Sequence, residues 1–369
     1  MQFFIEILTA ILMGYLAFTN MLATQIHFLL GTTPEPPTEE VLLESDTPAS
    51  LSRLPSEYYT DSFIPDVLLQ SAAYQQASVL SSVGTDFVAV NDPVEAIVNI
   101  YCTSITKKQI RTTTGTGFFV HPSGVVMTNA HVAQFLLLEK SGVFGDTDCV
   151  IRNGSPASPN FKAELLYIPP AWIKANASLI DDKAPSGTGE RDYALLYIMS
   201  DMDGNSLPAS TTFPALALNT DLLPRSVTES TVVAAGYPAG SLLRDGSDTD
   251  LLAKKAATTV SELYTFGSNY ADVVALRGSI MGEQGASGGP VVSNDGRVIG
   301  MITTRGDDTR DGTGSLRAIT VSHINRTITQ ETGFSLSSNL SGNIPYKANI
   351  FTTTMAPFLT QLLVKEARN

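Results

Sequence analysis

The sequence predicts an all-β chain with two six-stranded antiparallel β-barrels, an N-terminal transmembrane helix and short C-terminal helices. Between residues 96 and 321, short apolar runs alternate with Gly, Asn, Asp and Pro, a spacing typical of strands and turns in small barrels. Residues 7–30 contain no Asp, Glu, Lys or Arg, and an apolar run of that length can span a bilayer as a helix.

The apolar runs fall into two sets of six. The first set is residues 96–101, 117–120, 125–128, 150–152, 163–168 and 193–198, and the second is 232–235, 256–263, 273–276, 290–292, 298–303 and 316–321. Six strands are enough to close a small barrel, so each set predicts one barrel. A cleft between the barrels would bring residues of both sets together.

The remaining segments flank the barrels. Residues 1–30 are predicted to be a membrane anchor, with a secretory signal peptide as the alternative. Residues 31–61 are rich in Pro and acids and predict a spacer, and residues 62–86 predict a short helical segment. The barrel domain is assigned to residues 87–332. Its last helix is expected at 322–332, with Ser322 as its cap and an end near Gly333.

The C-terminal extension, residues 333–369, carries apolar residues at helical spacing: Phe358, Leu359, Leu362 and Leu363. We expect this apolar face to dock on the barrel, with a partner protein or a membrane as the alternatives.

The composition excludes some classes of partner. Hydrophobic residues make up 43% of the 369-residue chain, and the formal net charge is −13. No run of Lys and Arg occurs, which argues against nucleic acid as a partner. No His or carboxylate cluster has metal-ligand spacing, so we predict neither a metal nor a cofactor. Nothing in the sequence specifies an oligomeric state.

A serine flanked by glycines is the strongest chemical signal. In Gly285-Ala286-Ser287-Gly288-Gly289-Pro290, the hydroxyl of Ser287 is the candidate nucleophile. The backbone N–H groups of Gly285 and Ser287 are the candidate oxyanion hole. The alternative is an ordinary serine in a turn. The activated reading also requires a base that accepts the hydroxyl proton.

His131 is the candidate base, because it ends an apolar run in Thr128-Asn129-Ala130-His131 and because the pKa of histidine is close to neutrality. Asp192, before the run 193–198, is the candidate carboxylate that orients its ring. Asp181 and Asp182 in the preceding loop compete for that role. The chain order is therefore His, Asp, Ser.

These motifs resemble those of trypsin-like serine peptidases, most closely the HtrA/Deg branch. The resemblance rests on residues 115–120, 124–132, 233–240, 285–290 and 296–300 and covers roughly 90–330. It implies the chymotrypsin-like fold and polypeptide substrates. About 40 residues follow Arg326, too few for the PDZ domain usual in that branch. Ala286 stands where digestive proteases carry an Asp, which excludes activation by a salt bridge to a new amino terminus.

The resemblance also implies a substrate site. Residues 279–281 would line the base of the specificity pocket, where Met281 favours an apolar substrate side chain. Thr303, Thr304 and Arg305 would form the strand edge that pairs with the substrate backbone. Arg305 or Arg317 reaching into the pocket would favour an acidic side chain instead, and solvated arginines are the third reading.

Cys102 and Cys149 are the two cysteines of the chain. They fall on strands that are neighbours in chymotrypsin-type barrels, so a disulfide and two separate buried thiols are both compatible with the sequence. The resemblance favours a catalytic part outside the cytoplasm. The sequence thus predicts a membrane-anchored serine endopeptidase, with an inactive peptide-binding protein of the same fold as the alternative.

Overall fold

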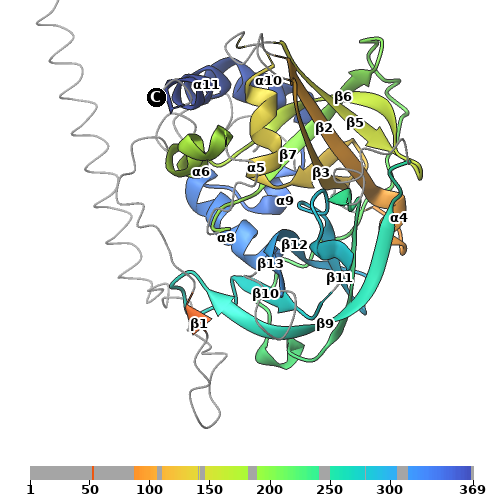
Figure 1. The fold of residues 1–369 in the computed structure, drawn as a ribbon, viewed down its shortest axis with the longest axis vertical. Coiled ribbons are helices and arrows are strands. Elements are labelled where there is room, and N and C mark those ends of the chain that lie inside the picture. Colours follow the sequence, from red (N-terminus) through yellow and green to blue (C-terminus); the bar gives the residue numbers. More distant parts are fainter. Residues whose placement is uncertain are drawn as a thin grey trace, which may run out of the picture. The chain divides into compact units, whose positions relative to one another are not determined.

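Two six-stranded antiparallel sheets close on themselves in the computed structural model, which describes residues 52–53, 87–105, 110–139, 141, 146–181, 189–240, 250–278, 280–305 and 315–366. The first barrel has the order β2 (Ile97–Ile105), β3 (Ile110–His121), β4 (Val125–Thr128), β7 (Ala194–Asp201), β6 (Ser158–Tyr167) and β5 (Asp146–Asn153). It forms the upper half of Figure 1.

The second barrel lies below it in Figure 1. Its order is β9 (Lys254–Thr265), β10 (Val273–Leu276), β13 (Leu316–Thr320), β12 (Val298–Arg305), β11 (Pro290–Ser293) and β8 (Thr231–Gly236), and β8 pairs with β9 to close the ring. The two predicted barrels are confirmed. All twelve predicted runs overlap strands. The turn residues between the runs end the strand pairing, so the runs mark the strands.

The segment before the barrels is largely outside the described residues. This applies to the predicted anchor and pre-barrel helix, and to the spacer except for β1 (Ser52–Arg53), which pairs in parallel with β9. Within the ranges that the structure describes, no helix is long and apolar enough to cross a membrane.

Strand register places the ends of two strands at one edge of the first barrel. Thr128, the last residue of β4, pairs with Ala194, the first residue of β7. His131 follows β4 by three residues and Asp192 precedes β7 by two, so the register brings both to the same edge. All four residues of β4 are buried, as expected for a strand covered on both faces.

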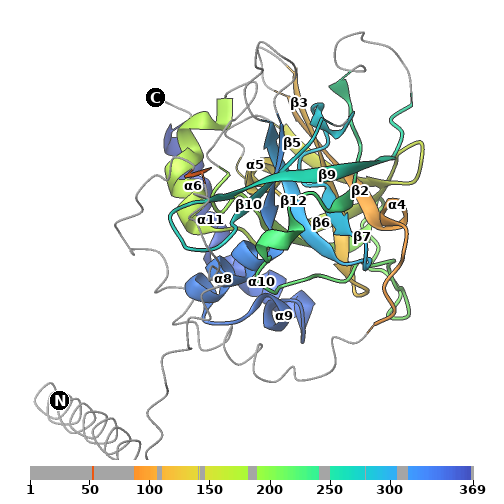
Figure 2. The same ribbon diagram turned by 90° about the horizontal axis from the view of Figure 1, so that it is seen from below.

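Short helices connect the strands and the ends of the chain (Figure 2). They are α4 (Pro93–Ala96), α5 (Ala130–Ala133), η1 (Gln134–Leu137), α6 (Pro170–Asn176), η2 (Ala177–Asp181), η3 (Arg225–Val227), η4 (Ile280–Gly282), α8 (Val321–Thr332), α9 (Leu336–Asn339), α10 (Ile344–Thr354) and α11 (Ala356–Glu366).

The C-terminal helix α10 packs on strands β6 and β7 of the first barrel, and α11 packs on α10, α6, η1 and η2. Phe351, Leu359 and Leu363 are fully buried in the core cluster of this barrel, whereas Phe358 is partly exposed. The buried face of α11 therefore does not include all four residues predicted for it, since Phe358 is partly exposed. The predicted cap of α8 was wrong by two residues: Thr320, not Ser322, accepts the N–H of His323 at 3.1 Å. The helix ends at Gly333, as expected.

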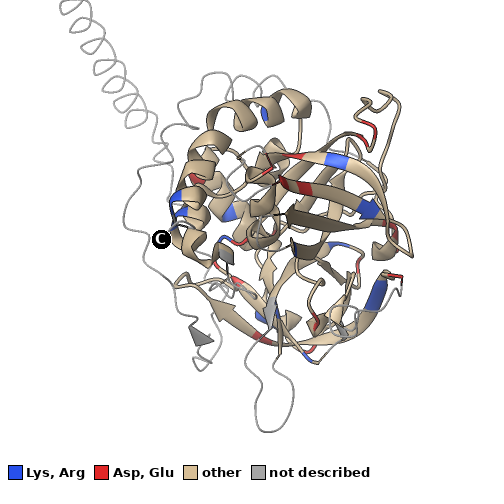
Figure 3. Cartoon of the chain, turned by 45° about the horizontal axis from the view of Figure 1, so that its top comes forward, with Lys and Arg blue, Asp and Glu red and all other residues tan. Residues whose placement is uncertain are grey.

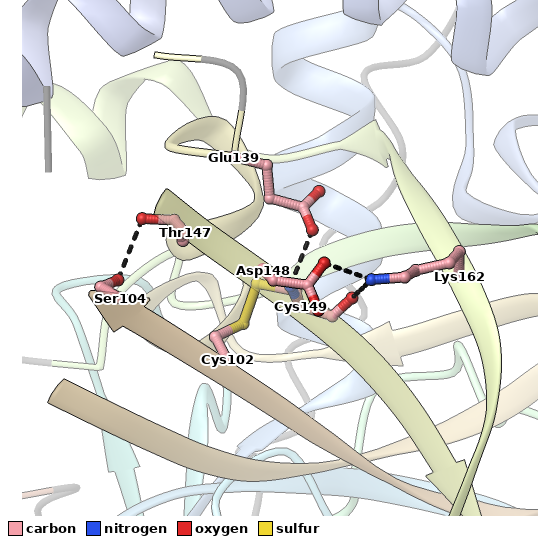
Figure 4. Close-up of a disulfide and its surroundings, with 7 residues drawn as sticks. All are labelled: Cys102, Ser104, Glu139, Thr147, Asp148, Cys149 and Lys162. Carbon is pink, nitrogen blue, oxygen red and sulfur yellow. Dashed lines mark hydrogen bonds and ion pairs between the residues drawn. A yellow bond between two sulfur atoms is a disulfide. The ribbon is translucent and has the colours of Figure 1, made fainter. Parts of the chain in front are cut away.

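Cys102 and Cys149 form a disulfide between β2 and β5 (Figure 4). They are directly opposite each other in the strand register, with their Cα atoms 4.0 Å apart. The Cys149 N–H donates to Oε1 of Glu139 at 2.8 Å. This contact ties the disulfide to the segment that follows α5 and η1.

Candidate active site

His131 and Asp192 make a two-point contact. Oδ2 of Asp192 lies 2.7 Å from Nδ1 of His131, and Oδ1 accepts the backbone N–H of His131 at 2.9 Å. The first N–H groups of a helix lack intrahelical acceptors, and Asn129, the N-cap residue of α5, makes no side-chain cap. The Asp192 carboxylate therefore caps α5 and orients the imidazole at once.

Two further hydrogen bonds hold Asp192 in place. Thr303 Oγ1 donates to Oδ2 of Asp192 at 2.8 Å, and Nδ2 of Asn129 donates to the Asp192 backbone oxygen at 2.8 Å. Asp192 is 3% exposed, so its carboxylate needs the donors from His131 and Thr303 to offset the loss of water. Asp181, a predicted competitor, ends η2, and Asp182 lies outside the described residues.

The residue before Asp192 is anchored to α8. Arg191 has a positive φ of 58°, an uncommon conformation for a non-glycine residue. Its guanidinium forms an ion pair with the buried carboxylate of Glu331, which also accepts a hydrogen bond from the Tyr167 hydroxyl. Burial raises the pKa of Glu331, and Arg191 opposes that effect. Sequence reasoning missed this pair, because nothing in the residues near 331 marks a partner at 191.

The serine loop needs glycine at the predicted positions. Gly285 has φ +96° and Gly288 has φ +88°. A Cβ on Gly288 would lie 2.0 Å from the Thr116 backbone oxygen, and a Cβ on Gly285 would lie 2.5 Å from that of Tyr237. The loop is therefore packed against both barrels through its backbone. Neither Gly285 N–H nor Ser287 N–H donates to another residue in the described ranges.

Ser287 Oγ lies near the same residue that holds Asp192. Its hydroxyl donates to the backbone oxygen of Thr303 at 3.5 Å, the long limit of a hydrogen bond. Within the described residues, no hydrogen bond joins Ser287 to His131. Thr303 thus contacts Asp192 through its side chain and Ser287 through its backbone.

The predicted substrate strand lies at the end of β12. Its pairing with β11 ends at Met301, whereas the pairing with β13 continues to Arg305. The backbone of 303–305 therefore has one strand neighbour among the described residues. The Thr303 side chain faces Asp192, a role that sequence reasoning missed. The side chains of Thr304 and Arg305 lie outside the described part.

Two residues near the predicted pocket have definite places. Met281 in η4 is 1% exposed and packs in the core cluster of the second barrel. The guanidinium of Arg317, an alternative specificity residue, lies over the ring of Tyr264 at 5.3 Å. This stacking occupies the Arg317 side chain.

Charged residues of both signs are interspersed over the strands and helices (Figure 3). Within the described ranges, no group of three or more His, Cys, Asp or Glu side chains is arranged to hold a metal ion.

A family model described as trypsin-like peptidase domain matches residues 115–301, slightly more than half of the chain. The chain belongs to this family. The matched range contains all three candidate catalytic residues of this trypsin-like peptidase. Among solved structures, it is similar to the crystal structure of Deg5, with 16% identity and a TM-score of 0.42 over 65% of this chain and 90% of that one. A comparison with curated proteins found no match.

Proposed function

We propose that this trypsin-like peptidase is a serine endopeptidase that cleaves peptide bonds through His131, Asp192 and Ser287. The observation that carries the proposal is the two-point contact of Asp192 with Nδ1 and the backbone N–H of His131. This contact fixes Nδ1 as the protonated nitrogen and leaves Nε2 to act as the base.

The reaction begins when Ser287 Oγ attacks the scissile carbonyl. Its proton passes to Nε2 of His131, and the Asp192 carboxylate stabilises the imidazolium that forms. The N–H groups of Gly285 and Ser287 bind the oxyanion. His131 then protonates the leaving amine, and water hydrolyses the acyl-enzyme by the same steps. Ser287 must first turn from Thr303, which costs little because the bond between them is 3.5 Å long.

The substrate would add a strand to the edge formed by residues 303–305. Backbone pairing of this kind binds extended polypeptides, and side-chain pockets select among them. Met281 is buried in the core of the second barrel, so the preference for an apolar residue before the cleaved bond rests on the resemblance. The stacking of Arg317 on Tyr264 weakens the case for an acidic one.

We further propose that residues 1–30 anchor the chain in a membrane and that the peptidase lies outside the cytoplasm. The uncharged run 7–30 supports the anchor. The Cys102–Cys149 disulfide supports an oxidising compartment, since such bonds rarely persist in the cytosol. The motifs support membership of the HtrA/Deg branch.

Fractionation tests the anchor. The full chain should remain with membranes after a high-salt wash, whereas a chain beginning at residue 62 should be soluble. If expression of the full chain gives a soluble product whose amino terminus has been cut near residue 23, a signal peptide is indicated instead.

A fluorophosphonate probe tests the catalysis. The probe should label the wild type at Ser287, because only an activated serine displaces its fluoride. Ser287→Ala should remain unlabelled and should unfold at nearly the same temperature. A folded wild type that resists labelling would favour the inactive peptide-binding alternative.

A further inference from the structure

Thr116, on strand β3 of the first barrel, forms hydrogen bonds with the serine loop of the second barrel. The side chain is fully buried. Its Oγ1 donates to the backbone oxygen of Gly285 at 2.6 Å and accepts the N–H of Tyr237 at 2.9 Å. The Thr116 N–H donates to the backbone oxygen of Ser287 at 2.7 Å. One residue therefore holds two carbonyls of the loop that carries the nucleophile.

The four carbonyls from 284 to 287 all have partners. Gln284 O accepts Ala239 N–H at 2.7 Å, Gly285 O accepts Thr116 Oγ1 at 2.6 Å, Ala286 O accepts Gly289 N–H at 3.0 Å, and Ser287 O accepts Thr116 N–H at 2.7 Å. In a planar trans peptide the N–H points opposite to the carbonyl. The partners of the Gln284 and Ala286 carbonyls therefore set the directions of the Gly285 and Ser287 N–H groups. The Gly285 carbonyl, held by Thr116, belongs to the peptide between those two.

Among these four partners, the Thr116 hydroxyl is the one side-chain donor. It binds the carbonyl of Gly285, the residue with the greatest backbone freedom. Gly285, without a Cβ, can reach backbone conformations closed to other residues. If its buried carbonyl lost the donor, the peptide could rotate toward another one. That rotation would turn the loop away from the geometry that an oxyanion hole requires.

We propose that Thr116 is a positioning residue for the oxyanion hole. Its hydroxyl fixes the peptide between Gly285 and Ala286. This peptide joins the two whose N–H groups form the hole, so fixing it keeps those two in their relative orientation. The inference rests on the proposed function of Ser287. The link also crosses the barrels, so the base and the oxyanion hole share one support: Thr128 Oγ1, three residues before His131, donates to the Thr116 backbone oxygen at 2.7 Å.

The decisive comparison is Thr116→Val against Thr116→Ser. Valine keeps the shape of threonine but has no donor, whereas serine keeps the hydroxyl. In fluorophosphonate labelling, Ser287 Oγ forms the O–P bond, fluoride leaves, and His131 takes the proton. We expect labelling of Thr116→Val to be about 10- to 100-fold slower, below the loss caused by removing a donor of the hole itself. Thr116→Ser should stay within about threefold of the wild type.

A matched control separates positioning from simple destabilisation. Thr147 is a buried threonine of the first barrel whose Oγ1 bonds Ser104 at 3.0 Å, beside the disulfide (Figure 4). Thr147→Val loses a comparable hydrogen bond without touching the serine loop, so its labelling rate should match the wild type. With a peptide selected by library profiling, Thr116→Val should lower kcat and leave KM nearly unchanged.

The outcomes distinguish this inference from the proposed function. A folded wild type that is never labelled overturns both. A labelled wild type with an equally fast Thr116→Val overturns the positioning role alone, as does an equal slowing in Thr147→Val. If Thr116→Val does not fold, Thr116→Cys replaces it, because a thiol is a much weaker donor than the serine hydroxyl. Equal rates for the Cys and Ser variants would then overturn the inference.

Discussion

Thr303 of the second barrel donates its hydroxyl to Oδ2 of Asp192 in the first, across 2.8 Å. The same carboxylate oxygen contacts Nδ1 of His131 at 2.7 Å. The orientation of the candidate base therefore depends on both barrels, and a change in how they pack would reach the imidazole through this carboxylate.

Thr303→Val should weaken catalysis by removing that donor. A hydrogen bond to a charged group is worth about 1.5–3 kcal/mol, so we expect kcat/KM to fall about tenfold or more. Thr303→Ser, which keeps the hydroxyl, should recover most of the activity. Steady-state kinetics with one peptide for all three proteins is the measurement, and equal activity of the Val and Ser variants would contradict the role.

Asp192→Asn should lower kcat by about four orders of magnitude, because the amide can stabilise the wrong His131 tautomer and cannot balance the imidazolium charge. Asp181→Asn and Asp182→Asn serve as controls and should change kcat little. If either control lowers kcat by a similar factor, Asp192 is not the carboxylate that orients His131.

The strand pattern of this chain was readable because apolar runs and turn residues act locally. β4 and β10 begin and end at the predicted residues. The cap of α8 was misread because Thr320 and Ser322 are both good caps. Thr320 is the cap because strand β13 ends there and the helix begins at the next residue.

The candidate site also combines residues that local sequence reveals with residues that it does not. The loop glycines around Ser287 are visible in the sequence because backbone geometry requires them. The partners of Asp192 and Arg191 are not, since Thr303 and Glu331 reach them across 111 and 140 positions of the chain. Such contacts depend on packing between elements, which local patterns do not contain.

Glu331→Gln should destabilise the fold and slow catalysis. It removes the charge that balances the buried Arg191 guanidinium, and breaking a buried pair costs about 3–5 kcal/mol. Because Arg191 precedes Asp192, kcat should fall as well. Glu229→Gln is the control: its pair with Arg277 is 61% exposed on both sides, so the free energy of unfolding should change by less than about 1 kcal/mol. Chemical denaturation compares the two, and equal effects would contradict the anchoring role.

Acid should destabilise the fold through a second buried cluster. Burial tends to raise the pKa of Asp272, but hydrogen bonds from His323, Ser268 and the Phe266 N–H lower it from 3.8 to about 2. Arg326 also pairs with this carboxylate. Because the folded pKa is depressed, its stabilisation is present above the unfolded value near 4 and is lost as pH falls through 2.

The size of that loss is about 2 kcal/mol. Burial also lowers the pKa of His323 below 6.5, although Asp272 opposes it. The unfolded chain then binds the histidine proton more readily, so stability also falls as pH drops below about 6.5. Unfolding measured from pH 8 to 2 should show both steps. Asp272→Asn should be less stable at pH 7 and should lack the step below pH 4.

Loss of the Cys102–Cys149 disulfide should lower stability without altering cleavage preference. The bond joins residues separated by 47 positions, and releasing a loop of that length costs about 4 kcal/mol in the chain-entropy model. It lies between β2 and β5, whereas the candidate site lies at the ends of β4 and β7. We therefore expect Cys102→Ser with Cys149→Ser to melt at a lower temperature and to cleave the same bonds in a peptide library. An unchanged melting temperature would contradict the structural role. A changed cleavage preference would mean that the disulfide influences the geometry of the candidate site.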